Sequence, residues 1–279
     1  MKLFVVSENT KNNRMDPKIE LRGVEKIYQT AQGEVDALSD ITLGVEDGEF
    51  LCIIGPSGCG KSTLLRILAG LYQQSAGEVV VNKNGASNRP TNAVVFQEYA
   101  IFPWRTVSDN VAFGLEMRGV PRGERDKRTS AYLSKVGLTQ FANHYPYQLS
   151  GGMKQRVALA RALATDPEIL LMDEPFGALD AQTRSVLQVE LVRIWEEEKK
   201  TVVYITHSIE EAIMLGDRVV LMTARPGKIK SIYEVAIPRP RSLQIRTTPE
   251  YNRLAQVIWE DLVEEVNKAM ENGEVHSDV

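Results

Sequence analysis

Hydrophobic and polar positions divide the chain into a β-rich beginning, a helical middle and a later part in which strands return. Ile41, Leu43 and Val45 alternate with polar residues, as expected of a half-buried antiparallel strand. Short strand-like runs predict further buried strands at 50–54, 93–96, 169–172, 201–206 and 219–222. The pattern therefore predicts an α/β fold, with a mixed β-sheet core and an antiparallel β subdomain near the N-terminus.

Helical spacing replaces the strand pattern from about Thr106 to Phe141, where charged residues are frequent and β-branched runs are few. Two interpretations of the charged segment Arg122 to Arg128 stay open, namely a solvated helix face that only packs or a functional surface. We expect a helical subdomain inserted into the α/β core, from about residue 99 to 164.

The C-terminal stretch combines a proline-rich run with an amphipathic helix. Pro238-Arg239-Pro240-Arg241 is typical of a linker, and Thr247 and Glu250 have the spacing of a capping box. One face of the following helix is apolar, through Leu254, Val257, Ile258, Leu262, Val263 and Val266. We divide the chain into three parts, namely a flexible N-terminal tail at 1–17, a main domain at 18–237, and a linker with an amphipathic helix at 238–279.

Composition and charge narrow the function classes. The 279 residues are 43% hydrophobic and 25% charged, as in an ordinary globular protein. The formal net charge of −4 argues against nonspecific binding to nucleic acid, so we expect no nucleic-acid partner. No apolar run approaches the roughly 18 residues of a membrane helix, so work at a membrane would need a partner. The two cysteines, Cys52 and Cys59, are predicted to be packing residues, and Met15 is an alternative start.

A glycine-rich run lies between the strand at 50–54 and a helical pattern that begins at Thr63. Its sequence, Gly55-Pro56-Ser57-Gly58-Cys59-Gly60-Lys61-Ser62, is a Gly-x-x-x-x-Gly-Lys-Ser phosphate loop in the strand, loop and helix context that this motif requires. Backbone N–H groups of such a loop form an anion nest, and the glycines leave room for a phosphate. We expect Lys61 to reach the β- and γ-phosphates of a nucleotide and Ser62 to bind Mg²⁺.

Two carboxylates directly follow the apolar run at 169–172. Asp173 and Glu174 therefore lie at the carboxyl end of a predicted parallel strand, where open α/β sheets bind ligands. A salt bridge at the strand end is the ordinary explanation for such a pair by itself. Beside a phosphate loop, the pair predicts a site in which Asp173 holds Mg²⁺ through water and Glu174 acts on the attacking water as general base.

The run Leu149-Ser150-Gly151-Gly152-Met153-Lys154-Gln155-Arg156 is the most specific motif of the chain. A serine at the N-cap followed by two glycines opens a helix with bare N–H groups, which predicts a second anion site. The run resembles the Leu-Ser-Gly-Gly-x-x-Gln-Arg signature of the ATP-binding subunits of ABC transporters, which contacts the γ-phosphate of ATP on the other subunit. The resemblance implies a homodimer formed with ATP, and nucleotide contacts for Ser150, Gly151, Gly152 and Gln155.

Further marks of this family occur in order between residues 19 and 237 and imply ATP and Mg²⁺ as ligands. Tyr28 matches the aromatic residue that stacks on adenine, and Gln97 matches the glutamine that senses Mg²⁺ and the attacking water. Asp180 matches a loop at the dimer interface and is implied to contact the nucleotide, and His207 matches the histidine that contacts the γ-phosphate. The resemblance implies catalytic roles for Lys61, Gln97, Glu174 and His207, Mg²⁺ binding by Ser62, Gln97 and Asp173, and nucleotide contacts along the phosphate loop to Thr63.

Other features are similar to one branch of the family, the importers of nitrate, sulfonates and taurine. They are Phe102-Pro103-Trp104, the Arg225-Pro226-Gly227 turn and the short C-terminal tail. The resemblance implies uptake of a small anion through integral membrane permease subunits, with an extracytoplasmic solute-binding protein as an indirect partner. It also implies a peripheral location at the cytoplasmic face of the cell membrane. We expect Phe102 and Trp104 to dock the permease, and core packing in the helical subdomain is the alternative for both.

Two other function classes compete with transport. A soluble ABC-type ATPase that acts in DNA repair or on ribosomes usually has a long coiled coil between phosphate loop and signature, or two cassettes in one chain. The interval from Lys61 to Ser150 is too short for such a coiled coil, and the chain has one cassette. A nucleotide kinase has no use for the signature helix. The sequence therefore favours a transport ATPase, and the identity of its solute rests on the family resemblance alone.

Overall fold

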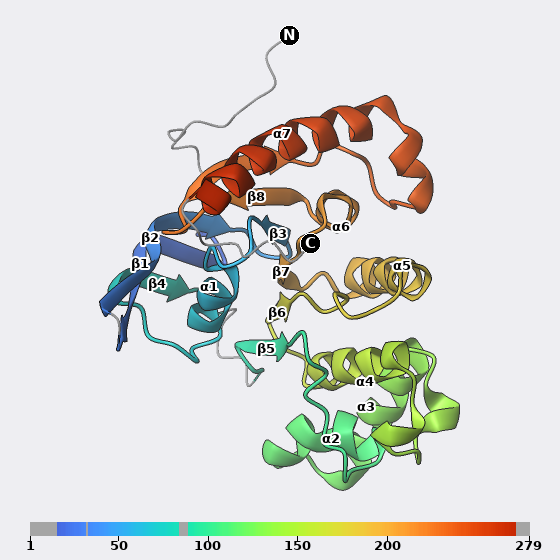
Figure 1. The fold of residues 1–279 in the computed structure, drawn as a ribbon. Coiled ribbons are helices and arrows are strands. Elements are labelled where there is room, and N and C mark those ends of the chain that lie inside the picture. The colour runs from blue at the N-terminus through green and yellow to red at the C-terminus, as the bar shows by residue number, and fades with distance from the viewer. Residues whose placement is uncertain (1–15, 32, 84–88, 272–279) are drawn as a thin grey trace. The chain divides into compact units, whose positions relative to one another are not determined.

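The computed structural model describes residues 16–31, 33–83 and 89–271. These residues form two compact units, one from the described residues up to 83 together with 201–271 and the other from 89–200. The predicted N-terminal tail lies outside the described residues apart from Asp16 and Pro17. The elements of both units are labelled in Figure 1.

A three-stranded antiparallel sheet opens the first unit, with β1 (Ile19–Thr30) between β2 (Gly33–Val45) and β4 (Ala76–Val81). Ile19 is paired with Val45 on one side and with Val81 on the other. Along β2, the apolar residues at 41, 43 and 45 are buried and Thr42 is exposed, because side chains of a strand alternate between its two faces. The antiparallel β subdomain predicted near the N-terminus is confirmed.

The core of the first unit is a second sheet of parallel strands. β3 (Phe50–Ile54) pairs in parallel with both β7 (Thr201–Ile205) and β8 (Arg218–Met222), and β9 (Ile229–Glu234) adds an antiparallel edge to β8. Every residue of β3 and β7 is buried, as expected of parallel strands that are covered on both faces. Helix α6 (Ile209–Leu215) packs against β3 and β8, and α1 (Lys61–Leu68) contacts β7.

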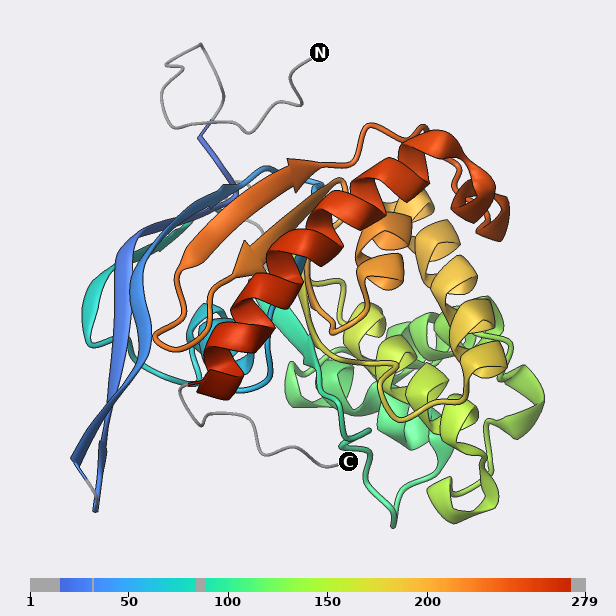
Figure 2. The ribbon, with the colours of Figure 1, turned by 45° about the horizontal axis from the view of Figure 1, so that its top comes forward.

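Helix α7 (Pro249–Glu271) follows the short helix η3 (Leu243–Thr247). It lies alongside β8 and β9 in both ribbon views (Figures 1 and 2), and Lys230 of β9 donates to the Asp261 carbonyl oxygen at 3.0 Å. The predicted cap of this helix is wrong by one residue. Thr248 is the capping residue, because its hydroxyl accepts from the Tyr251 N–H at 3.3 Å, whereas the Thr247 hydroxyl donates to a carbonyl within η3.

The run at 238–241 is anchored to the first unit. The Arg241 side chain is only 4% exposed and donates to the carbonyl oxygens of Ile213 and Gly216 at the end of α6. Arg239 forms an ion pair with Asp217 at 2.8 Å. A guanidinium presents several donors in a fixed geometry and can satisfy the carbonyl groups that a helix end leaves without partners. The segment predicted as a linker therefore holds the chain in place before α7.

The second unit combines a parallel strand pair, β5 (Asn92–Val95) and β6 (Ile169–Asp173), with helices. The helix α2 (Val107–Met117) packs against α3 (Arg122–Lys135) and α4 (Gly151–Ala164), and α5 (Ala181–Glu198) contacts α4. Two short 3-10 helices, η1 (Thr139–Phe141) and η2 (Pro146–Gln148), lie between α3 and α4. Strands and a group of helices in one chain confirm the predicted α/β class with its inserted helices.

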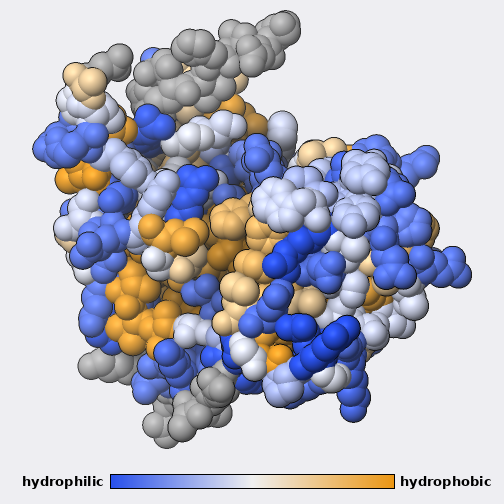
Figure 3. Space-filling view, turned by 90° about the horizontal axis from the view of Figure 1, so that it is seen from below, coloured by the Kyte–Doolittle hydropathy of each residue, from blue (hydrophilic) through white to orange (hydrophobic). Residues whose placement is uncertain are grey.

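Both hydrophilic and hydrophobic side chains reach the surface, as the face in Figure 3 illustrates. Large apolar residues with exposed side chains include Leu71, Trp104, Met117, Tyr147, Val186 and Trp259. Among the helices of the described residues, none combines the length and the apolar character that crossing a bilayer requires.

Candidate active site

The phosphate loop of the first unit connects β3 to α1, and its shape depends on glycine at one close contact. Gly60 is the N-cap of α1 and has a φ of 100°, a left-handed conformation that favours glycine. A Cβ atom at this position would lie 2.7 Å from the Ala37 carbonyl oxygen and 2.7 Å from a methyl carbon of Leu38. The loop is therefore pressed against β2, and no larger residue fits at Gly60.

The Lys61 side chain folds back over this loop. Its ammonium donates to the carbonyl oxygens of Gly55 at 2.9 Å and Pro56 at 2.8 Å, and the residue is only 4% exposed. Burial raises the pKa of the neighbouring Cys59 thiol, so this cysteine stays protonated, in agreement with a packing role. The loop thus carries a buried positive charge beside the N–H groups that open α1, which is the arrangement that an anion requires.

Tyr28 lies on β1 in the same unit as the phosphate loop. Its hydroxyl is 3.3 Å from the Thr63 hydroxyl in the first turn of α1, and its ring meets the Tyr72 ring edge to face with 6.2 Å between centroids. The Lys26 ammonium lies 5.0 Å from the Tyr28 ring centroid. These contacts place an aromatic ring close to the start of α1.

His207 follows β7 in the first unit, on a short loop that a buried carboxylate holds. The Glu211 carboxylate accepts from the Thr206 hydroxyl at 2.5 Å and from the Tyr204 hydroxyl at 3.3 Å. The Ser208 hydroxyl accepts from the Glu211 N–H at 3.2 Å, so the residues on both sides of His207 are fixed. Our sequence analysis missed Glu211, although Ser208 and Glu211 have the capping-box spacing that signals such a helix start.

Gln97 and the acidic pair lie at one edge of the strand pair in the second unit. Val95 is paired with Met172, so the chain leaves β5 toward Gln97 where β6 ends at Asp173. A Cβ atom built on Gly177 would lie 3.8 Å from both the Gln97 amide nitrogen and the Glu174 Cβ atom. Gln97 and Glu174 therefore both lie close to Gly177.

The signature run forms the start of α4 in the second unit. The Ser150 hydroxyl accepts from the Met153 N–H at 3.4 Å, as predicted for an N-cap. A Cβ atom on Gly151 would lie 2.8 Å from the Tyr99 hydroxyl, and one on Gly152 would lie 2.6 Å from a methyl carbon of Thr183. Close packing with neighbouring segments therefore requires both glycines.

Asp180 and Gln155 of the second unit differ in their hydrogen bonding. The Asp180 carboxylate caps α5 by accepting from the N–H groups of Gln182 and Thr183, and these bonds hold the pKa of Asp180 below its usual value. The Gln155 side chain is 1% exposed, and its amide atoms have no hydrogen-bond partner within the described residues. Nucleotide contacts by these two residues stay predictions.

The structure assigns the predicted residues to the two units. Tyr28, the phosphate loop to Thr63 and His207 belong to the first unit. The second unit holds Gln97, Asp173, Glu174, Ser150, Gly151, Gly152, Gln155 and Asp180. Each unit thus carries a self-contained part of the predicted chemistry, an anion nest in the first and the carboxylates with the signature helix in the second.

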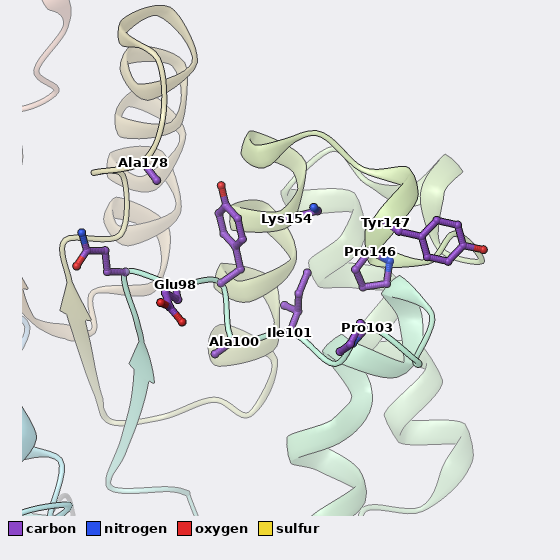
Figure 4. A pocket seen from close by; sticks show the side chains of 10 residues that line it. Glu98, Ala100, Ile101, Pro103, Pro146, Tyr147, Lys154 and Ala178 are labelled. Carbon is purple, nitrogen blue, oxygen red and sulfur yellow. The ribbon is translucent and has the colours of Figure 1, made fainter.

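A pocket of about 710 Å³ lies within the second unit, next to Gln97. Its lining combines the segment after β5 with the η2 region, where Ile101 and Pro103 lie on the same side as Pro146 and Tyr147 in Figure 4. Lys154 of α4 also lines it. The lining therefore combines apolar residues with polar and charged ones, which include Glu98 and Lys154.

Phe102 and Trp104 differ in their surroundings. The Phe102 ring packs at 4.5 Å from the Phe113 ring, and Asn110 of α2 bonds both its N–H and its carbonyl group. The Trp104 side chain is 72% exposed. Phe102 is therefore largely part of the helical core, while Trp104 faces solvent.

A glycine loop with a buried lysine between a parallel strand and a helix, together with carboxylates at the end of another parallel strand, defines a phosphate-loop nucleotide-hydrolysing domain. The ABC transporter family model matches residues 38–177. The chain belongs to the ABC transporter family and is one of its ATP-hydrolysing subunits.

Relatives of known sequence extend this similarity over nearly the whole chain. The uncharacterized ABC transporter ATP-binding protein MJ0412 of Methanocaldococcus jannaschii is 50% identical over 264 residues, which cover 94% of this chain and 98% of that protein. The taurine import ATP-binding protein TauB of Roseobacter denitrificans is 43% identical, over 83% of this chain and 90% of that protein. The nitrate import ATP-binding protein NrtD of Synechocystis sp. is 41% identical, over 86% and 93% respectively.

A solved structure of the ATP-binding cassette MJ0796, a dimer in a post-hydrolysis state bound to ADP and phosphate, has the same fold. It matches with a TM-score of 0.68 and 36% sequence identity, and the match covers 79% of this chain and all of that cassette.

Proposed function

We propose that this protein powers uptake of a small anion of the nitrate, sulfonate or taurine type, as the ATPase subunit of an ABC importer. The observation that carries the proposal is the identity of 41–45% to ATP-binding proteins named for taurine, aliphatic sulfonate and nitrate import. Identity at this level over most of both chains supports a shared task, and the finer choice among the three solutes stays open.

In the proposed site the phosphate loop binds ATP. Lys61 neutralises the β- and γ-phosphates, N–H groups of the loop and of α1 surround them, and Tyr28 stacks on the base. The buried ammonium of Lys61 supports this role, because its partners in the loop include two neutral backbone carbonyl groups, and a charged phosphate oxygen offers it a stronger partner.

Hydrolysis in this proposal needs a base and a stabilised γ-phosphate. Glu174 accepts a proton from the attacking water, Gln97 orients that water, and His207 binds the γ-phosphate. The fixed loop around His207 and the shared position of Gln97 and Glu174 support these roles, because catalytic groups act best when they are held before the substrate arrives.

The residues proposed for Mg²⁺ fit this ion. Ser62, Gln97 and Asp173 offer hydroxyl, amide and carboxylate oxygens, which are the ligands that Mg²⁺ prefers. Within the second unit, the pairing of Val95 with Met172 places Gln97 and Asp173 at the ends of neighbouring strands. When bound, Mg²⁺ would neutralise the charge that develops on the phosphate oxygens.

The active form in this proposal is a homodimer with two nucleotides between its subunits. The signature helix of one copy, beginning at Ser150, would contact the γ-phosphate bound by the phosphate loop of the other. The dimeric state of the related MJ0796 cassette supports this arrangement. Asp180 would lie at the subunit contact.

The partners in this proposal are integral membrane permease subunits, with an extracytoplasmic solute-binding protein acting indirectly. The subunit would sit peripherally on the cytoplasmic face of the membrane and reach its permease through Trp104, which follows the pocket residue Pro103 in the chain. The competing function is DNA repair or work on ribosomes. These three relatives do not support it, because each is named for the import of a solute.

An uptake assay tests the proposal. Cells that carry this subunit with its cognate permease and binding protein should accumulate labelled taurine, an alkanesulfonate or nitrate, and the Lys61→Ala variant should not, because it loses the charge that binds the phosphates. Uptake of only a sugar or an amino acid would overturn the solute class. Equal uptake with Lys61→Ala would instead contradict the phosphate-loop site.

A further inference from the structure

The turn between β8 and β9 lies against the phosphate loop. The backbone of Gly227 in this turn exchanges hydrogen bonds with β2, donating to the Ala37 carbonyl at 3.1 Å and accepting from the Ser39 N–H at 3.0 Å. A Cβ atom on Gly227 would collide with the Cys59 carbonyl oxygen of the phosphate loop. The turn and the loop are therefore in direct backbone contact.

Arg225 adds a polar link at the tip of the same turn. Its guanidinium donates to the Gly58 carbonyl oxygen at 3.1 Å, in the middle of the phosphate loop. At the base of the turn, a Cβ atom on Gly55 would lie 3.0 Å from the Met222 carbonyl oxygen, where β8 ends. The end of β8 thus lies against the start of the loop, and the turn contacts its middle.

The C-terminal helix, α7, contacts the same turn. Glu265 of α7 is 2% exposed, and its carboxylate accepts from the Ala224 N–H at 3.0 Å. Although burial opposes its ionisation, hydrogen bonds from Lys268 and Lys230 keep the pKa of Glu265 below its usual value. A charged acceptor at this position bonds a backbone N–H more strongly than a neutral one.

These contacts form a continuous path from α7 to the phosphate loop within the first unit. We propose that α7, through Glu265 and the turn at 223–228, positions the phosphate loop for ATP. Glu265 and Arg225 are positioning residues, because they act on the loop and not on the nucleotide. The inference rests on the proposed binding of the ATP phosphates by this loop, and it gives the C-terminal helix and the Arg225-Pro226-Gly227 turn a function.

The first test separates positioning from general stability through ATPase kinetics of the full-length protein. Glu265→Ala should raise the KM for ATP roughly tenfold and leave kcat unchanged. The variant loses the hydrogen bond from the Ala224 N–H to a charged carboxylate, and this bond helps to position the loop that binds ATP. Glu265→Gln keeps an acceptor for the Ala224 N–H, so its KM should be close to that of the wild type. Thermal unfolding identifies any variant that fails to fold.

Glu264→Ala is the matched control. Glu264 lies on the same helix and pairs with the same two lysines, Lys230 and Lys268, but does not bond the turn. Its KM should equal that of the wild type. An equal rise in KM for Glu264→Ala and Glu265→Ala would overturn the inference, and so would an unchanged KM for Glu265→Ala.

Arg225 provides a second, independent pair of variants. If Glu265→Ala does not fold, this pair still tests whether the turn positions the phosphate loop. Arg225→Ala should weaken binding of a fluorescent ATP analogue by roughly threefold to tenfold, and Arg225→Lys, which retains a cationic donor, should recover part of the affinity. Equal affinities for the two variants and the wild type would overturn the inference.

Lys61→Ala distinguishes the inference from the proposed function on which it rests. Loss of nucleotide binding in Lys61→Ala, with no effect of the Arg225 and Glu265 variants, would leave the phosphate site intact and refute only the role of α7. Normal binding in Lys61→Ala would refute the phosphate site itself.

Discussion

Glu174 adopts a backbone conformation that few residues other than glycine occupy, with a φ of 45°. Such strain costs of order 1–3 kcal/mol and persists where the surrounding structure enforces it. Here β6 ends at Asp173, and the chain turns at once so that the Gly177 N–H donates to the Glu174 carbonyl oxygen at 3.0 Å. The strain is consistent with a carboxylate held in one direction for the proton transfer we propose.

Replacing this carboxylate by an amide tests the proposed base. Glu174→Gln keeps the size of the side chain and removes the proton acceptor, so ATP hydrolysis should fall by about 10²–10⁴-fold while ATP still binds. Steady-state ATPase rates and size-exclusion chromatography with ATP and Mg²⁺ measure both effects, and the variant should accumulate as a dimer with unhydrolysed ATP.

Glu124→Gln is the control for that substitution, because it makes the same change in an exposed ion pair of α3 with Arg128. Its rate should match the wild type. A Glu174→Gln protein that hydrolyses ATP at the wild-type rate and stays monomeric would refute both the base and the dimer.

At the scale of elements, α7 is attached to β9 mainly by charged and polar contacts. Lys230 bridges Glu264 at 2.6 Å and Glu265 at 2.9 Å, and the Tyr233 hydroxyl bonds the Asp261 carboxylate. The apolar face predicted for this helix contributes as well, since Ile258 is fully buried. Exposed ion pairs contribute little to stability, so the buried carboxylate of Glu265 is the important member of the cluster.

The cluster predicts sensitivity to acid. Hydrogen bonds from Lys230 and Lys268 lower the pKa of Glu264 to about 2. The unfolded chain binds this proton near its ordinary pKa of about 4.3, so the stability from the ion pairs of Glu264 is complete above about pH 5 and falls as the pH drops toward about 2. The loss should be small, because Glu264 is more than half exposed.

The effect develops between the two pKa values, so melting temperatures at about pH 6 and about pH 3 measure part of it. The wild type should lose more stability between them than Glu264→Gln, which has no proton to gain at this position. Equal losses in the two proteins would show that protonation of Glu264 does not lower the stability of the protein.

At the scale of the whole molecule, the proposed work at a membrane requires a surface for the permease. Trp104→Ala should abolish co-purification with the permease and leave ATP binding by the isolated subunit unchanged, because tryptophan is enriched among the residues that dominate binding at protein interfaces, and Trp104 is 72% exposed. Phe102 is unsuitable for this test, since its packing on Phe113 means that its loss would disturb the helical core.

Trp259→Ala is the matched control for the docking test. Trp259 is also exposed, at 59%, but lies on α7 in the other unit. Its substitution should leave co-purification intact. If the permease still binds Trp104→Ala normally, the docking surface lies elsewhere on the molecule.

Much of the fold and of the candidate site was predictable because it is encoded by neighbouring residues. The alternation of Ile41, Leu43 and Val45 predicts their burial, since side chains of a strand point to opposite faces. The phosphate loop and the signature run are continuous motifs, and Ser150 caps its helix as its spacing predicts. These features depend on local geometry, which a short stretch of sequence determines by itself.

Other features depended on contacts between residues far apart in the chain. Phe102 and Trp104 are both aromatic residues of one short run, but the packing of α2 places the Phe102 ring against Phe113 while Trp104 is 72% exposed. The bond from Ala224 to Glu265 joins residues 41 positions apart. Only the tertiary structure decided these contacts, because the partner of a side chain is chosen by which distant surfaces meet when the chain folds.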